Sequence, residues 1–127
     1  MKNILITGGL GFIGSALTKR LHNKYPDYKL IVVDNNEDHH RLDEIKDNIK
    51  IYSYDICEQR LIDKLFELYT FDGVFHLASK KPIVNEEYKG TEFIKTNVLG
   101  TSLILNNCVK HNSRLLYTSN TEVYGSL

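Results

Sequence analysis

The sequence predicts an α/β fold in which a parallel sheet carries helices on both faces, and three observations predict it. Short apolar segments rich in β-branched residues recur along the chain, segments with helical periodicity separate them, and a cluster of glycines follows the first apolar segment. Strands that alternate with helices need crossover connections, and right-handed crossovers place helices on both faces of a parallel sheet. We therefore predict a Rossmann-type, doubly wound α/β domain of five strands that ends after the fifth.

The five strands are predicted from their apolar runs. Strands buried on both faces of a parallel sheet read as nearly continuous apolar segments, although the third run in this chain alternates more than the others. The predicted strands cover residues 3–7, 29–34, 49–54, 73–78 and 114–119.

Helical periodicity appears in three connecting segments. The first helix is predicted from residue 12 to about residue 24, packed on the sheet through its apolar positions. These positions are Phe12, Ile13, Ala16, Leu17 and Leu21. A long helical stretch is predicted from roughly residue 87 to residue 110.

The second helix is predicted to begin at a capping box. Asp55, followed three residues later by Glu58, resembles such a box with Asp in place of Ser or Thr. The apolar stripe expected for this helix consists of Leu61, Ile62, Leu65, Phe66 and Leu68.

Composition limits the classes of function. The 127 residues, of which 42% are hydrophobic, suffice for one domain over residues 1–127. The 16 Lys and Arg balance the 16 Asp and Glu, so we expect no nucleic acid and no membrane surface as partner. Two cysteines far apart and the lack of a secretory or spanning segment favour the cytoplasm. No Cys or His spacing suits zinc, so we expect no metal, and we interpret His39 and His40 as polar loop residues.

The glycine cluster between the first strand and the first helix has the pattern of a diphosphate-binding loop. Gly8 suits the tight turn, Gly11 leaves room for the approach of a diphosphate, and Gly14 allows close packing of helix and strand. The start of the helix offers free N–H groups to the phosphates. A tight turn that binds nothing is the alternative, but the flanking strand, the helix and a later acidic residue favour a dinucleotide.

That acidic residue is Asp34, at the end of the second strand and about twenty positions after Gly14. Its carboxylate can accept hydrogen bonds from both ribose hydroxyls of adenosine and would repel a 2′-phosphate, which predicts NAD rather than NADP as cofactor. Arg41 could soften this preference, although it is several loop residues away. Asp34 can also cap a turn with Asn35 and Asn36, which is compatible with ribose binding.

Together these residues resemble the extended short-chain dehydrogenase/reductase family, which includes NAD-dependent nucleotide-sugar epimerases, dehydratases and decarboxylases. The resemblance covers the whole chain. It rests on Thr-Gly-x-x-Gly-x-x-Gly at residues 7–14, Asp55-Ile56, His-Leu-Ala at residues 76–78, Lys81, Asn97, and the segment from Tyr117 to Gly125 that ends in Val-Tyr-Gly. Residue by residue, the resemblance implies a cofactor site formed by Gly8, Gly11, Phe12, Ile13, Gly14, Asp34, Asn35, Asp55, Ile56, Leu77, Ala78, Lys81, Asn97, Thr118 and Ser119.

The same resemblance implies catalytic positions after the fifth strand, where this chain departs from the pattern. Asn120 stands where family members carry the Ser or Thr that hydrogen-bonds the reacting sugar hydroxyl, and an amide differs from a hydroxyl in reach. Thr121 and Glu122 stand where dehydratases carry Asp and Glu, which weakens assignment as a 4,6-dehydratase. A solvated loop charge is the alternative for Glu122.

The family's Tyr-x-x-x-Lys pair is expected on a helix after the fifth strand, and the chain ends at Leu127 before that helix. Tyr25 and Lys29 have the spacing, but Pro26 disfavours a helix there, and the pair lies at the sheet edge opposite the cofactor. Two functions therefore stay open: the NAD-binding part of an enzyme acting on a nucleotide sugar, or a non-catalytic NAD-binding or assembly module. Because the last strand would form a sheet edge, we also expect self-association.

Overall fold

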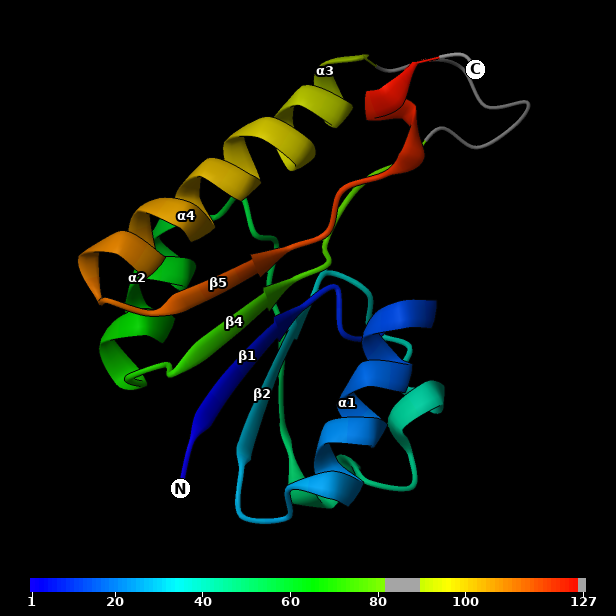
Figure 1. Ribbon diagram of the computed structural model, residues 1–127, viewed down its shortest axis with the longest axis vertical. Helices are drawn as coiled ribbons and strands as arrows, with labels where there is room; N and C mark the ends of the chain where they lie inside the picture. The colour runs from blue at the N-terminus through cyan, green and yellow to red at the C-terminus, as the bar shows by residue number, and fades with distance from the viewer. Residues whose placement is uncertain (82–89, 126–127) are drawn as a thin grey trace.

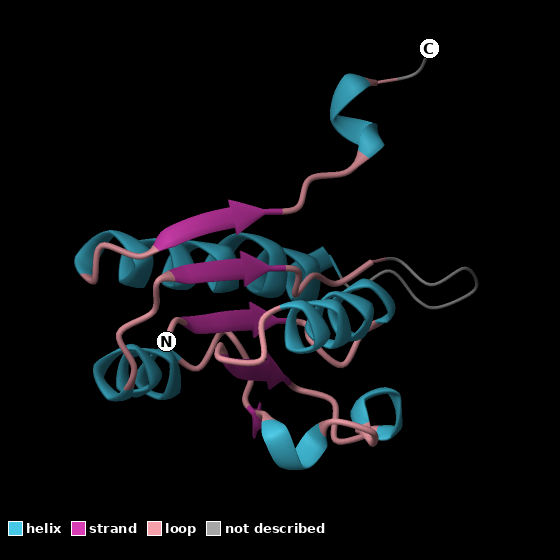
Figure 2. Ribbon diagram, turned by 60° about the horizontal axis from the view of Figure 1, so that its bottom comes forward, coloured by secondary structure: helices cyan, strands magenta, loops and turns pink. Residues whose placement is uncertain are grey.

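The computed structural model of the 127-residue chain describes residues 1–81 and 90–125. Five parallel strands form one sheet in the order β3-β2-β1-β4-β5, and helices cover both faces (Figures 1 and 2). The predicted Rossmann-type fold with five strands is confirmed. The strands are β1 (Asn3–Thr7), β2 (Lys29–Asp34), β3 (Lys50–Ser53), β4 (Gly73–His76) and β5 (Arg114–Tyr117).

The strand order reverses beside β1. The chain moves outward from β1 through β2 to β3, then crosses back to β4 on the other side of β1 and continues to β5. In open α/β sheets a crevice forms at the carboxyl ends of the strands at such a reversal. The fold therefore places the candidate crevice between the ends of β1 and β4.

The helices form two layers. Helix α1 (Phe12–Lys24) covers one face, and α2 (Gln59–Leu68) and α4 (Thr101–Lys110) pack together on the other (Figure 1). The short α3 (Gly90–Phe93) continues through a π-helical segment, Ile94–Gly100, into α4. The predicted long helix is confirmed from residue 90 onward, whereas its expected first residues, 87–89, lie outside the described residues. Three short 3-10 helices occupy His40–Leu42, Lys46–Asn48 and Thr121–Tyr124.

Each face of the sheet has its own apolar core, because successive side chains of a strand point to opposite faces. Leu5 of β1 belongs to the core under α2 and α4, together with Phe66 and Ile104, and all three are buried. The neighbouring Ile4 and Ile6 belong to the core under α1. The two layers thus fix the position of the crevice from both sides.

Helix α1 is confirmed, but its expected buried face is partly wrong. Phe12, Ile13 and Ala16 are exposed, and the buried positions are Gly14, Ser15 and Thr18. No side chain fits at Gly14, because the start of α1 lies directly against the backbone of Gly8 and Gly9.

The predicted capping box is wrong. Helix α2 begins at Gln59, and no side chain caps it at Glu58. The Asp55 carboxylate instead accepts a hydrogen bond from Cys57 N, at 2.9 Å, so it closes a turn before the helix. Leu68 is also misplaced in the predicted stripe, because it is exposed near the end of the helix.

Strands β3, β4 and β5 are shorter than predicted at their carboxyl ends. Beyond His76 and Tyr117 the ladder continues only through single hydrogen bonds, from Leu77 N to Thr7 O (3.1 Å) and from Thr118 N to His76 O (3.3 Å). The predicted strand ends are therefore the loops that surround the crevice.

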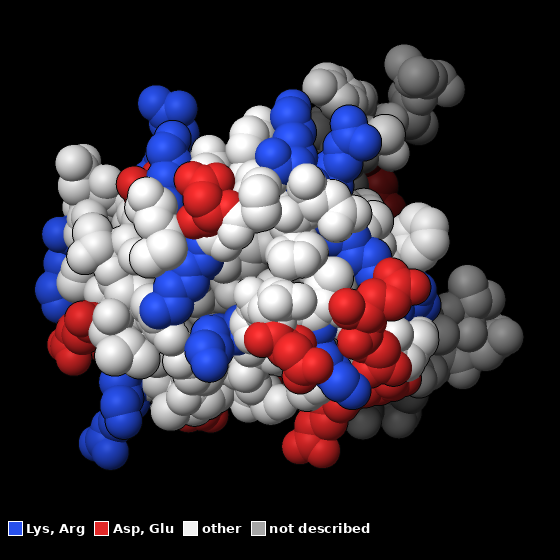
Figure 3. Space-filling model, turned by 90° about the horizontal axis from the view of Figure 1, so that it is seen from below, with Lys and Arg blue, Asp and Glu red and all other residues white. Residues whose placement is uncertain are grey.

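Side chains of both charge signs lie on the face shown in Figure 3. Exposed ion pairs include Lys19 with Glu44 at 3.2 Å and Lys46 with Asp43 at 3.3 Å. Such pairs contribute about 0–1 kcal/mol each, so the stability of this fold rests on its two apolar cores.

Candidate functional site

Two cavities lie side by side at the carboxyl edge of the sheet. The first has a volume of about 680 Å³ and lies over the ends of β1, β2 and β3, and the second has a volume of about 510 Å³ and lies over the ends of β1, β4 and β5. They share a wall formed by Gly8, Gly11 and residues 77–80. They therefore form one groove with two compartments across the reversal of strand order.

The glycine loop forms the floor of this groove. Gly8 has a φ of +69°, and a Cβ there would lie 2.7 Å from Ala78 N. A Cβ on Gly14 would collide with the carbonyl oxygen of Gly8, so this glycine lets helix α1 pack closely on the glycine loop, rather than on the strand as expected. A Cβ on Gly11 would approach only Gly8 O, at 3.2 Å, and would otherwise project into open space. Gly8 and Gly14 are thus required by the loop itself, whereas Gly11 keeps the groove clear.

The start of α1 faces the second cavity and carries no neutralising group of its own. Gly11 is the N-cap residue, no side chain caps the helix, and its first turn contains no acidic residue. Phe12 and Ile13 line the second cavity. Backbone N–H groups at a helix start that lack internal partners favour an anion, so this end of the groove suits a phosphate group.

Asp34 connects two loops at the first cavity. Its Oδ2 accepts a hydrogen bond from Leu10 N at 2.9 Å, and its Oδ1 accepts one from Asn36 N at 3.0 Å. The interpretation as a turn cap is confirmed for Asn36. A carboxylate has about four acceptor positions, so Asp34 retains capacity for further donors in the first cavity, which it lines together with Asn35.

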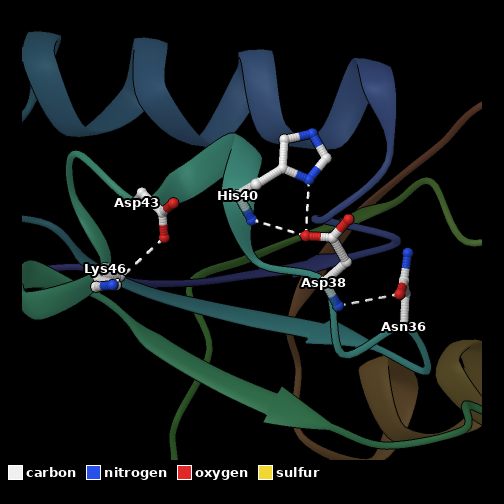
Figure 4. Close-up of polar contacts among 5 residues, drawn as sticks. All are labelled: Asn36, Asp38, His40, Asp43 and Lys46. Atoms are coloured by element: carbon white, nitrogen blue, oxygen red, sulfur yellow. Dashed lines mark hydrogen bonds and ion pairs between the residues drawn. The ribbon is translucent and has the colours of Figure 1, made fainter.

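Side chains that accept a hydrogen bond from the backbone N–H two residues later organise the loop after β2. Figure 4 shows Asn36, Asp38 and His40 of this series. Asn36 Oδ1 accepts from Asp38 N at 3.0 Å, and Asp38 Oδ1 accepts from His40 N at 3.1 Å. His40 Nδ1 lies 2.7 Å from the same oxygen, and these hydrogen bonds from His40 hold the pKa of Asp38 below its usual value. Arg41, next in the chain, has its Cζ 6.0 Å from the centre of the Phe12 ring and, within the described residues, makes no ion pair with Asp34.

The far wall of the first cavity comes from Asp55 and the π-helical segment. Lys95 Nζ lies 3.9 Å from Asp55 Oδ2, and Lys80 pairs with Glu92. Ile56 is buried against Gly100, where a Cβ would come within 2.6 Å of Ile56 Cδ1. Gly100 thus lets the long helix approach the loop after β3, which closes this side of the cavity.

Asn97, also in the π-helical segment, holds the loop after β4. Its Oδ1 accepts from Lys80 N at 2.8 Å, and its Nδ2 donates to Lys80 O at 2.9 Å. Asn97 and the exposed Lys81 both line the second cavity. The amide of Asn97 therefore fixes the wall that the two cavities share.

His76, at the end of β4, is fully buried beneath the groove. Its Nδ1 lies 2.6 Å from Thr7 Oγ1, and its Nε2 lies 2.9 Å from Thr101 Oγ1. Burial lowers the pKa of His76 to about 4, so the ring is neutral near pH 7. His76 links β1, β4 and α4 at the point where the strand order reverses.

The segment after β5 brings one of the three predicted catalytic residues to the groove. Asn120 lines the second cavity together with Thr118 and Ser119. Its Oδ1 accepts from Glu122 N at 2.9 Å and caps the last 3-10 helix. Thr121 and Glu122 are exposed on that helix and are not part of the cavity wall, which favours the solvated-charge interpretation of Glu122.

With this geometry in place, comparison with known proteins shows the family. Residues 4–127 match the model of the NAD dependent epimerase/dehydratase family. The chain belongs to this family. The resemblance stated from the sequence is therefore confirmed.

Individual members of the epimerase/dehydratase family show the extent of the similarity. The chain is 33% identical to a dTDP-glucose 4,6-dehydratase of Haemophilus influenzae, covering 100% of this chain and 42% of that protein. A crystal structure of a dTDP-glucose 4,6-dehydratase from Bacillus anthracis in complex with NAD superposes with a TM-score of 0.86 at 28% identity, over 100% of this chain and 40% of that one. The crystal structure of a UDP-glucose 4-epimerase from Bifidobacterium longum in complex with NAD⁺ and UDP gives a TM-score of 0.85 at 30% identity. This match covers 98% of this chain and 38% of that one. The chain thus spans about two fifths of the length of these relatives.

Every residue predicted for the cofactor lines one of the two cavities of this family member. Several lining residues were not predicted from the sequence, because long-range packing brings them there. In the long helix, Glu92, Lys95 and Thr96 share one side, and their helical spacing is the signal that could have revealed them. The other residues missed are Val33, Asn36, Tyr54, Ser79, Lys80, Thr101, Tyr117 and Val123.

Two further findings concern the described residues alone. They contain no group of three or more His, Cys, Asp or Glu side chains arranged to hold a metal ion. Nor does any of their helices have the length and hydropathy needed to cross a bilayer.

Tyr25 ends α1 and Lys29 begins β2, so this pair lies at the amino edge of the sheet, opposite the groove, as predicted.

Proposed function

We propose that this chain binds NAD along the groove and serves as the cofactor-binding part of a nucleotide-sugar epimerase or dehydratase. The observation that carries the proposal is the pair of cavities joined at the glycine loop, directly over the reversal of strand order. A dinucleotide consists of two nucleoside halves joined by a diphosphate, so its shape fits two cavities with an anion-favouring helix start between them. Gly11 supports the fit, because a Cβ there would project into the groove, whereas Gly8 and Gly14 are required by the loop itself.

The residues divide between the two halves of the ligand. Asp34, Asn35, Asp55 and Ile56 would hold the adenosine half in the first cavity, and the backbone of Gly11, Phe12 and Ile13 would hold the diphosphate. Leu77, Ala78, Lys81, Asn97, Thr118 and Ser119 would surround the nicotinamide half in the second cavity. When bound, NAD would supply an acceptor, and in its reduced form a donor, of hydride for a carbon atom of the sugar.

Asn120 is the residue of this chain that we propose to contact the sugar. It lies in the wall of the second cavity, and because its Oδ1 is engaged by Glu122 N, its Nδ2 group is left to donate. A donor at this position would hold the oxygen attached to the reacting carbon. We propose no catalytic role for Thr121 or Glu122 beyond shaping this turn, since both side chains are exposed.

Titration calorimetry with NAD and NADP tests the proposal. The wild-type chain is expected to bind NAD more tightly than NADP. Asp34→Ala is expected to weaken NAD binding and to reduce the difference in affinity between NAD and NADP. Glu37→Ala is the matched control, because it removes an exposed carboxylate from the same loop. Equal affinity of the wild type for both dinucleotides would contradict the role of Asp34, and binding of neither would overturn the proposed function.

We also propose that the chain associates with itself through the outer side of the long helix. Ile94, Val98, Leu105 and Val109 are exposed there at spacings of four and seven residues, and Leu116 of β5 is exposed as well. No described element covers these positions, and such an apolar stripe favours a partner helix. Light scattering after size exclusion is expected to give at least the dimer mass, and Val98→Glu is expected to give the monomer. A monomeric wild type in concentrated solution would contradict self-association.

A reducing cytoplasm is the compartment we propose. Cys57 and Cys108 are both free thiols in the structure, and Cys108 is buried. Unpaired, buried thiols persist in reducing compartments. Retention of both free thiols in protein purified without reductant would support this proposal, and a disulfide between them would contradict it.

A further inference from the structure

Thr7, His76 and Thr101 form a chain of hydrogen bonds beneath the groove, and the positions of its hydrogens can be deduced. Thr7 is fully buried, and its Oγ1 has two partners, His76 Nδ1 at 2.6 Å and Ala78 N at 3.3 Å. The backbone N–H of Ala78 can only donate. The hydroxyl hydrogen of Thr7 therefore has His76 Nδ1 as its acceptor among the described residues.

This assignment fixes the tautomer of His76. A neutral imidazole carries one ring hydrogen, so an Nδ1 that accepts from Thr7 requires the hydrogen on Nε2. Nε2 then donates to Thr101 Oγ1, 2.9 Å away. The opposite tautomer would leave the hydroxyl hydrogen of the fully buried Thr7 without an acceptor, which carries a desolvation cost.

The consequence falls on Thr101. Its oxygen accepts the hydrogen of His76 Nε2, so its own hydroxyl hydrogen cannot return to that nitrogen. No other partner of this hydroxyl is found among the described residues, and Thr101 lines the second cavity. The first cavity does not include Thr101 in its wall.

We propose that Thr101 is a binding residue of the second cavity, whose hydroxyl, oriented by His76 and Thr7, donates to an acceptor oxygen on the nicotinamide riboside half of the dinucleotide. The inference rests on the proposed function, and it adds a residue that the sequence pattern did not indicate. His76 acts here as a positioning residue, because it contacts Thr101 rather than the ligand. As long as the ring is neutral, the hydrogen bonds run from Thr7 to His76 and from His76 to Thr101.

The test compares two ligands on one set of variants. NAD fills both halves of the groove, whereas ADP occupies only the adenosine and diphosphate part. Thr101→Val removes the hydroxyl at nearly constant side-chain volume. This variant is expected to have an NAD affinity roughly 2- to 10-fold lower than the wild type and an unchanged ADP affinity. Thr101→Ser keeps a hydroxyl and is expected to restore NAD binding. Ser102→Ala, at the exposed neighbouring position, is the matched control.

Calorimetry separates the outcomes. An equal loss of NAD and ADP affinity in Thr101→Val would indicate a purely structural role and overturn the proposal, as would unchanged NAD affinity. A wild type that does not bind NAD, with or without ADP binding, would overturn the proposed function itself, whereas NAD binding that does not depend on the Thr101 hydroxyl would overturn this inference alone.

Nitrogen-15 spectra of His76 provide a readout that needs neither ligand nor variant. The hydrogen is expected on Nε2, with Nδ1 unprotonated, throughout the neutral pH range. A ring hydrogen on Nδ1 would reverse the direction of the hydrogen bonds among Thr7, His76 and Thr101. This result would overturn the proposal even if Thr101→Val failed to fold.

Discussion

Asn97 binds both backbone groups of Lys80: its Oδ1 accepts from the N–H at 2.8 Å, and its Nδ2 donates to the carbonyl at 2.9 Å. The peptide thus held belongs to the wall shared by the two cavities. A single side chain of the long helix therefore holds one of the two loops that both cavities share.

Asn97→Asp tests this dependence. The carboxylate keeps the acceptor for Lys80 N but loses the donor and faces the carbonyl of Lys80, so we expect a loss of stability of about 1–3 kcal/mol and weaker NAD binding. Urea unfolding and calorimetry measure the two effects. Asn106→Asp, at an exposed position of the same helix, is expected to change neither. Similar behaviour of the two variants would contradict a special role for Asn97.

Gly11→Ala and Gly14→Ala are expected to separate binding from folding. The new Cβ at Gly14 collides with Gly8 O, so this variant should lose several kcal/mol of stability, in the range of an overpacked core. The new Cβ at Gly11 projects toward open space, so this variant should change stability by about 1 kcal/mol or less and lose NAD affinity. Thermal unfolding and NAD titration on both variants check this, and unaltered NAD affinity in Gly11→Ala would count against a diphosphate at that position.

The buried His76 predicts a pH dependence of stability. Its pKa falls from 6.5 to about 4 on folding, so between these values the unfolded chain binds more protons than the folded one. The stability that the chain has with a neutral His76 is fully present above pH 6.5 and is lost as the pH falls toward 4. The loss in free energy of unfolding has an upper bound of about 3 kcal/mol. Urea unfolding at pH 7.5, 6 and 5 is expected to show the decline, and His76→Gln is expected to flatten it. The same slope in wild type and variant would assign the effect to other groups.

Contact between Gly100 and Ile56 can be measured as a coupling. Gly100→Ala places a Cβ 2.6 Å from Ile56 Cδ1 and should destabilise the fold by about 1–3 kcal/mol. In an Ile56→Ala background the colliding atoms are absent, so the same substitution should cost less. A double-mutant cycle yields this difference, and strictly additive effects would show that the helix does not approach Ile56 so closely.

Much of the fold follows from local patterns in the sequence. The runs at Ile4, Val32 and Val74 predict buried strands because burial on both faces requires continuous apolar segments. The strand order could not be derived in the same way, because it depends on pairings between distant segments.

The buried face of α1 shows why local periodicity has limits. Phe12 and Ile13 are the most apolar residues of its first turn, yet both are exposed. The helix passes so close to Gly8 and Gly9 that a Cβ at Gly14 would collide with their backbone, so this position must be a glycine. Close backbone approach decided the orientation of this helix, and hydrophobicity did not.

The candidate site follows from sequence where a motif and a strand end coincide. Gly8, Asp34 and Ala78 lie along the groove as expected, because loops at the carboxyl ends of parallel strands converge. Thr101 and Lys95 come from a helix whose distance from the sheet is set by Gly100 and Ile56. Their place in the groove depends on packing that no short motif records.

Because the two cavities share a wall, a dinucleotide bound as proposed would be a bivalent ligand of this groove. In the proposed binding mode each mononucleotide unit would bind its own cavity, and the diphosphate link would raise the effective concentration of the second unit once the first is bound. Displacement of the peptide at Lys80 would change the separation of the two compartments as well as their shapes. Avidity, more than the affinity of either half, is therefore the quantity most sensitive to this loop.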